Sequence, residues 1–132
     1  MASPKSNPYQ EMIQQITGVS RHDALIIERL MRETILHSTL DWLSQEEFAN
    51  AARKAQQLFK IAPPYFYTQQ ACFAATFKRM QAEGRLQRAL DKKNDQVIAK
   101  ARETVTLCRR HEDELSSICQ CLGNTYFPPV SA

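Results

Sequence analysis

The residues best suited to chemistry in this chain are its four cysteines and three histidines. Near the C-terminus, Cys108 and His111 are followed by Cys119 and Cys121, and thiolate and imidazole are the ligands that structural zinc sites use. In a continuous helix, however, Cys108 and Cys119 lie about 16 Å apart along the axis, whereas zinc holds sulfur at about 2.3 Å. The sequence therefore predicts no metal site and four reduced, structural thiols.

The sequence contains no recognisable catalytic motif. The histidines, His22, His37 and His111, are widely separated, and none has a recognisable serine or cysteine nucleophile beside it. The three glycines stand far apart, whereas phosphate-binding loops and nucleophile elbows need glycines clustered within a few residues. We therefore predict a protein that is not an enzyme, with no catalytic residues and no cofactor.

Basic residues concentrate in the second half of the chain. Between Lys78 and Arg110 there are ten Lys or Arg and four Asp or Glu, whereas the net charge of the whole chain is only +3. Such a stripe attracts nucleic acid or an acidic partner through its summed field, although a solvated helix face with acid–base pairs gives the same pattern. The candidate nucleic-acid contacts are Lys78, Arg79, Arg85, Arg88, Lys92 and Lys93.

Helical periodicity runs through nearly the whole chain, and no strand-like alternation persists. We predict an all-α fold, a single-domain helical bundle over residues 1–132 with about five helices and a long C-terminal helix. Residues 1–8 are expected to be a flexible N-terminus, and residues 124–132, which hold two adjacent prolines, an extended C-terminal tail.

Several residues mark the ends of the first helices. Gly18 is expected to end a helix that begins after Pro8. Ser20 is expected to cap a second helix that runs to near His37. Ser44 and Glu47 have the spacing of a capping box, which predicts the start of a third helix. The single tryptophan, Trp42, is expected to fill the corner between the second and third helices.

Two further helices are predicted after Pro63-Pro64, which stops the third helix. The first runs from Thr68 to Glu83 and is ended or kinked by Gly84; the second runs from Arg85 to Leu122 without Gly or Pro. Large apolar residues share one side of the first of these helices: Phe66, Phe73, Phe77 and Met80.

The final helix carries a heptad seam, a line of residues spaced alternately by three and four. Its members are Ile98, Ala101, Val105, Cys108, Glu112, Leu115, Cys119 and Leu122. Glu112 interrupts this seam, and because a buried unpaired carboxylate is costly, we expect it to pair with Arg109 or His111 of a partner or to lie near water. The flank with Val97 is also fairly apolar, which favours a bundle or a dimer of bundles.

Association is the function that these patterns favour. We expect a small cytoplasmic protein that regulates, adapts or inhibits a protein partner and that forms a homodimer, with no membrane segment because the longest apolar runs are far too short. The alternative is a nucleic-acid-binding accessory protein that uses the basic face from Lys78 to Arg110. The expected partner or dimer interface comprises Val97, Ile98, Ala101, Val105, Cys108, Glu112, Leu115, Cys119 and Leu122.

Overall fold

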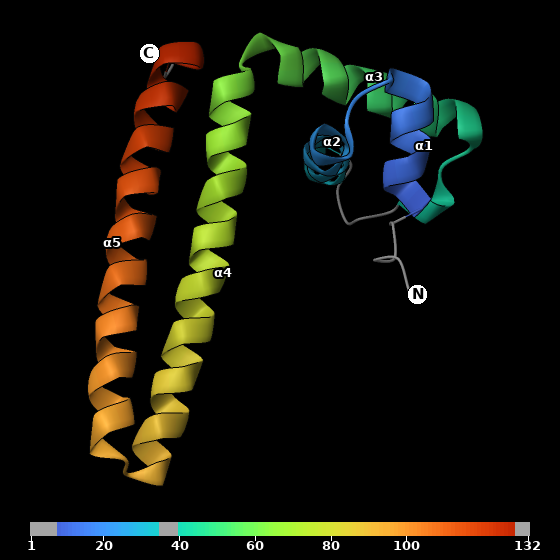
Figure 1. The fold of residues 1–132 in the computed structure, drawn as a ribbon. Coiled ribbons are helices and arrows are strands. Elements are labelled where there is room, and N and C mark those ends of the chain that lie inside the picture. Colours follow the sequence, from blue (N-terminus) through green and yellow to red (C-terminus); the bar gives the residue numbers. More distant parts are fainter. Residues whose placement is uncertain (1–7, 35–39, 129–132) are drawn as a thin grey trace. The chain divides into compact units, whose positions relative to one another are not determined.

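The computed structural model describes residues 8–34 and 40–128. These residues form five α-helices, one short 3-10 helix and no strand, which confirms the predicted all-α fold (Figure 1). The elements are α1 (Pro8–Thr17), α2 (Arg21–Thr34), η1 (Leu40–Trp42), α3 (Gln45–Ile61), α4 (Pro63–Lys92) and α5 (Asp95–Tyr126). The expected end of the second helix near His37, nearly all of the expected N-terminal segment 1–8 and residues 129–132 of the expected C-terminal tail lie outside the described residues.

The chain divides into two compact units, Met1–Pro63 and Pro64–Ala132. We call the first the N-terminal bundle, in which α1, α2 and α3 each pack against the other two. We call the second the hairpin, because it consists of α4 and α5 running side by side in opposite directions (Figure 1).

The predicted caps organise the N-terminal bundle. Gly18 has a φ of +73°, a conformation that glycine adopts at little cost, and its N–H donates to the carbonyl of Gln14 at 2.8 Å to end α1. Ser20 Oγ accepts from the N–H of Asp23 at 3.2 Å at the start of α2. Ser44 and Glu47 form the expected capping box at the start of α3. Local side-chain chemistry thus sets where these helices begin and end.

The N-terminal bundle has a dense apolar core. Among the described residues of this unit, twelve hydrophobic ones are buried, and the largest fully buried side chains come from all three helices. They are Ile13, Ile26, Ile27, Met31 and Phe48. This unit therefore has the burial expected of a small self-contained helical bundle.

Trp42 lies on the surface, contrary to our expectation. It ends η1, and 84% of its area is exposed, while Leu40 of the same short helix is buried. Leu40 is therefore the buried residue of this short helix, and the indole of Trp42 is presented to solvent.

The break between the last two helices was predicted in the wrong place. Helix α4 runs through Gly84 to Lys92, where the chain turns at Lys93, which has a φ of +54°. Asn94 then caps α5, with its side-chain oxygen accepting from the N–H of Val97 at 3.3 Å. Gly84 needs no special geometry, since a Cβ there would meet only the end of the Arg88 side chain at 3.6 Å.

The other end of the hairpin is closed by aromatic rings. Tyr65 and Phe66, in the first turns of α4, each make an edge-to-face contact with Phe127, with ring centroids 5.4 Å and 6.0 Å apart. A Cβ on Gly123 would lie 3.2 Å from the Tyr65 ring, so glycine allows the close approach. Helix α5 extends to Tyr126, three residues into the segment expected to be an extended tail.

Candidate interaction surfaces of the hairpin

The heptad seam of α5 is the edge of that helix that faces α4. Between Ile98 and Leu122, the eight predicted seam residues are the only ones that are not exposed. Helix α4 supplies a matching line of buried and half-buried residues, again spaced by three and four. These residues are Tyr65, Thr68, Cys72, Ala75, Arg79, Ala82, Leu86 and Ala89. Eight of the nine α5 side chains expected at an intermolecular interface thus face α4 of the same chain, and Val97 is the exception.

Two side-chain pairs set the register of the hairpin. Arg79 Nε donates to Glu112 Oε1 at 2.7 Å, and Cys72 faces Cys119, whose thiol is close enough to help raise the pKa of Cys72. Each pair lies seven residues from the other on both helices, which is two helical turns in a coiled coil. The same register places Ala82 beside Cys108 and Leu86 beside Val105.

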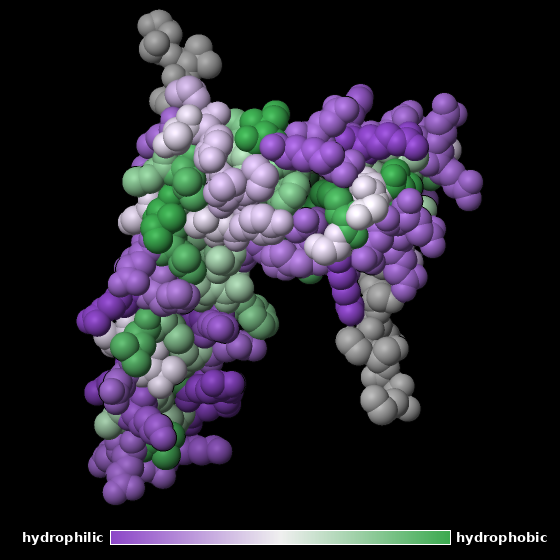
Figure 2. Space-filling view, turned by 45° about the horizontal axis from the view of Figure 1, so that its top comes forward, coloured by the Kyte–Doolittle hydropathy of each residue, from purple (hydrophilic) through white to green (hydrophobic). Residues whose placement is uncertain are grey.

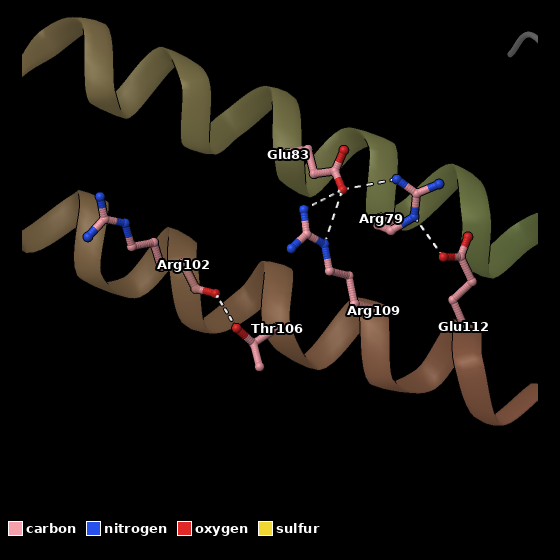
Figure 3. A network of polar contacts seen from close by, with 6 residues as sticks. All are labelled: Arg79, Glu83, Arg102, Thr106, Arg109 and Glu112. Atoms are coloured by element: carbon pink, nitrogen blue, oxygen red, sulfur yellow. Dashed lines mark hydrogen bonds and ion pairs between the residues drawn. The ribbon is translucent and has the colours of Figure 1, made fainter.

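Glu112, the residue that interrupts the seam, is one end of a network of ion pairs across the hairpin (Figure 3). Arg79 bridges Glu112 on α5 and Glu83 on its own helix, where Nη1 lies 2.9 Å from Oε1. Arg109 Nη2 approaches the same Glu83 oxygen at 3.2 Å. The partner of Glu112 is therefore Arg79 of the same chain, and neither Arg109 nor His111 of a second molecule is needed.

The network holds both carboxylates in their charged form. The pKa of Glu112 is lowered by a hydrogen bond from the Thr76 hydroxyl and by Arg79. The pKa of Glu83 is lowered by hydrogen bonds from Arg79 and from Arg109. Because hydrogen bonds to a carboxylate favour its ionised form, the network is present at neutral pH.

The core of the hairpin is thin. Five residues of its described part are buried: Phe66, Ala75, Ala82, Ala89 and Val105. Three of the five are alanines spaced by seven on α4, which let the two helices approach closely but bury little apolar surface. In contrast, twelve hydrophobic residues are buried in the shorter N-terminal bundle. The hairpin therefore gains much less from apolar burial than the bundle does.

Large apolar side chains lie on the outside of the hairpin instead. Five are at least half exposed: Phe77 (61%), Met80 (58%), Val97 (50%), Leu107 (56%) and Ile118 (51%). Figure 2 shows hydrophobic side chains interrupting the hydrophilic surface along this unit. Phe77 and Met80 are three residues apart on the outer side of α4, and Val97, Leu107 and Ile118 belong to α5. Exposed apolar clusters of this kind mark contact surfaces more often than random surface does.

The two flanks of the seam differ in charge. One flank holds the Glu83–Arg109 ion pair. We call the other the cationic flank; residues at seven-residue spacing define it. These residues are Ala71, Lys78, Arg85 and Lys92 on α4, and Val97, Thr104, His111 and Ile118 on α5. The flank contains three permanent cations and no acid, so nothing across the seam neutralises it.

A groove of about 390 Å³ lies on the cationic flank. Its lining residues are Ala82, Arg85, Gln96, Val97, Lys100, Ala101 and Thr104. The two alanines belong to the seams of their helices, so their short side chains leave the space that forms the groove. Arg85 and Lys100 supply cations on either side of it, one from each helix. The groove thus combines an apolar floor with a positively charged rim.

The six candidate nucleic-acid contacts do not form one site. Arg79 is used in the ion pairs with Glu83 and Glu112, at 26% side-chain exposure. The other five, Lys78, Arg85, Arg88, Lys92 and Lys93, are exposed, and none forms an ion pair with a described residue. Arg85 and Arg88 also line a second hollow, of about 310 Å³, on the outer side of α4 beside Met80.

The cysteines lie along the hairpin as single thiols. Cys108 and Cys119 are half-buried in the seam, and Cys121 is exposed. Burial, together with the neighbouring Cys119 thiol, raises the pKa of Cys72. Within residues 8–34 and 40–128, no three His, Cys, Asp or Glu side chains come together as metal ligands.

Sequence reasoning missed the seam on α4 and the groove. The heptad spacing of Ala75, Ala82 and Ala89 is visible in the sequence and would have indicated a second helix edge as long as that of α5. Asn94 followed by Asp95 is a good helix start and would have placed the turn. Predicting the groove requires the register in which α4 and α5 pack, and the sequence does not give this register.

Comparison of the chain with protein-family models, with curated proteins and with solved structures finds no match. Among the described helices, none combines the length and the apolar character that crossing a membrane requires.

Proposed function

We propose that the protein acts by association, as a small non-enzymatic adaptor, regulator or inhibitor that binds a protein partner through the hairpin. The observation that carries this proposal is the contrast between five buried residues in the described hairpin and five large apolar residues at least half exposed on it. Removing such side chains from water drives protein association, and aromatic residues and Met are enriched at interfaces. A partner would complete the apolar packing that α4 and α5 begin.

Phe77 and Met80 form the most exposed apolar part of α4. An aromatic ring that anchors in a partner's pocket contributes much of an interface's energy, and the flexible thioether of Met adapts to different partner shapes. This outer side of α4 therefore suits direct contact with another protein.

A second copy of the chain is one candidate partner, and the homodimer remains a prediction. Because α4 already faces the seam of α5, a second copy would contact the outward side chains of the hairpin. Among the residues expected at the dimer interface, Val97 is the one that is half exposed.

Nucleic-acid binding is the second candidate function. It is favoured by the exposed cations near the turn between α4 and α5, Arg85, Arg88, Lys92 and Lys93, which have no ion-pair partner among the described residues. Binding through phosphates weakens steeply as salt increases. Retention on random duplex DNA at about 50 mM salt, lost at about 200 mM, would favour this function; no retention at the lower salt would count against it.

We also propose that the protein works in the cytoplasm. All four cysteines are unpaired thiols, and thiols stay reduced in the cytosol.

Affinity capture with matched variants tests the association. Phe77→Asp with Met80→Asp places two charges on the exposed stripe of α4, and Trp42→Asp changes an even more exposed apolar residue of the N-terminal bundle. Proteins captured from the native host by the wild-type chain should be lost with the double variant and kept with Trp42→Asp. Circular dichroism checks that both variants remain helical. If the wild type captures no protein, or the double variant captures the same set, the proposed function is wrong.

A further inference from the structure

The groove on the cationic flank has the features of a binding site for a helix. Its floor is formed by Ala82 and Ala101, and Val97 forms part of its wall. Helices pack by placing side chains of one into the spaces between side chains of another, and small residues at the contact allow close approach. Two antiparallel helices that leave such a space between them can accept a third helix along their length.

Charge specifies what kind of helix fits. Arg85 and Lys100 face the groove from opposite helices. Lys78 and Lys92 continue the positive charge seven residues to either side of Arg85. The two lines that define the cationic flank contain no Asp or Glu, and the carboxylates of α5 on this side, Glu103 and Glu114, lie on the neighbouring lines of Gln96 and Lys100. On the other side of the seam, Glu83 and Arg109 already neutralise each other. Carboxylates of a partner molecule would therefore neutralise the positive charge beside the groove.

Two exposed apolar residues lie on the flank of α5 that borders the groove, one towards each end of the helix. Val97 and Ile118 lie on the line that borders the groove, 21 residues apart, and both are half exposed. Such a stretch of helix is about 32 Å long. A partner helix of similar length would therefore find an apolar contact near each of its ends, the alanine floor of the groove between α4 and α5, and cations beside them, which suits an amphipathic helix.

We propose that this groove binds an acidic amphipathic helix of a protein partner, which completes a three-helix arrangement with α4 and α5. The inference rests on the proposed function and names the class of segment that the partner supplies. A helical peptide fits better than nucleic acid, because phosphates would contact Arg85 and Lys100 but would gain nothing from the apolar floor or from Val97.

A peptide pair tests this inference with the full chain. The probe is a synthetic helix of three heptads, with Leu at its core positions and Glu at the flanking positions, and its twin has Gln for every Glu. We expect the acidic peptide to bind at least about tenfold more tightly than its twin, as charge complementarity requires. Arg85→Glu with Lys100→Glu should abolish this preference. The matched control, Arg53→Glu with Lys60→Glu on exposed positions of α3, should retain it.

Five results would overturn the inference, four of them from the peptide experiment. These four are equal binding of the two peptides, no binding of either, an unchanged preference in the Arg85→Glu, Lys100→Glu variant, and displacement of the acidic peptide by duplex DNA at lower concentration than by unlabelled peptide. A wild-type dimer that this variant dissociates in sedimentation would assign the groove to a second copy, and would also overturn it. None of these results affects association through Phe77 and Met80, which the capture experiment measures separately.

Discussion

Arg79 on α4 and Glu112 on α5 meet across the hairpin, with Nε and Oε1 2.7 Å apart, at positions that both belong to the heptad lines of their helices. A charged pair in a seam fixes register, because any slip of one helix would leave each charge facing an apolar side chain. Both side chains are partly exposed, at 26% and 20%. Water therefore reduces both the desolvation penalty of the two charges and the strength of their attraction.

The hairpin should lose stability in acid. The pKa values of Glu83 and Glu112 are lowered below the ordinary value of 4.5. Groups with a lowered pKa in the folded state stabilise it above their unfolded pKa, and this contribution is lost as the pH falls through the folded pKa. We expect the thermal midpoint to be level from about pH 7 to 5 and to fall below about pH 4.5. Glu112→Gln should be less stable at neutral pH and show a smaller decrease in acid; an identical pH profile would contradict this role.

Enlarging the alanine line of α4 should force the two helices apart. Ala82 is 3% exposed in the seam, and added methylenes in a packed core cost about 1–3 kcal/mol. Ala82→Leu should therefore lower the free energy of unfolding by this amount in urea titrations. Ala74→Leu, on the exposed side of the same helix, is the control and should change it by less than about 0.5 kcal/mol. Equal effects of the two substitutions would mean that α4 and α5 do not pack as described.

The glycines of α1 and α4 should respond in opposite ways to alanine. Gly84 is inside α4 with room for a Cβ, so Gly84→Ala should stabilise the protein by about 0.5–1 kcal/mol. Gly18 has a φ of +73°, so Gly18→Ala should destabilise it by about 1 kcal/mol. Thermal unfolding of both variants measures the difference. A destabilising Gly84→Ala would mean that α4 is bent or interrupted there.

The cysteines should differ in their rates of alkylation. Burial raises the pKa of Cys72, so a smaller fraction of its thiol is the reactive thiolate, while Cys121 is exposed. We expect iodoacetamide to label Cys121 first and Cys72 more slowly at pH 8, as followed by peptide mass spectrometry. The two rates should converge in urea, where both thiols are exposed. Faster labelling of Cys72 in the native protein would contradict its position in the seam.

Features set by local chemistry were predicted well from the sequence. The cap at Ser20, the capping box at Ser44 and the helix end at Gly18 each depend on residues within one turn. The seam of α5 was also predicted, because its spacing of three and four is a property of one helix. These signals need no knowledge of the rest of the fold.

Features that depend on contacts between helices, such as which helix side is exposed, could not be predicted from the sequence of one helix. The pattern on α4 indicates that Phe77 and Met80 share an apolar side, but not that this side is exposed. The turn was misplaced because Gly84 is a stronger breaker signal than Lys93, although Lys93 adopts the left-handed conformation.

Amide hydrogen exchange of the purified chain tests the central claim, that the hairpin is incompletely packed on its own. Helix α2 has six buried residues in 14, whereas α5 has one in 32. Local stability follows buried contacts, so the central amides of α5 should exchange faster than those of α2 in the isolated protein. Protection of α5 equal to or greater than that of α2 would show that the hairpin needs no partner, and would contradict the claim.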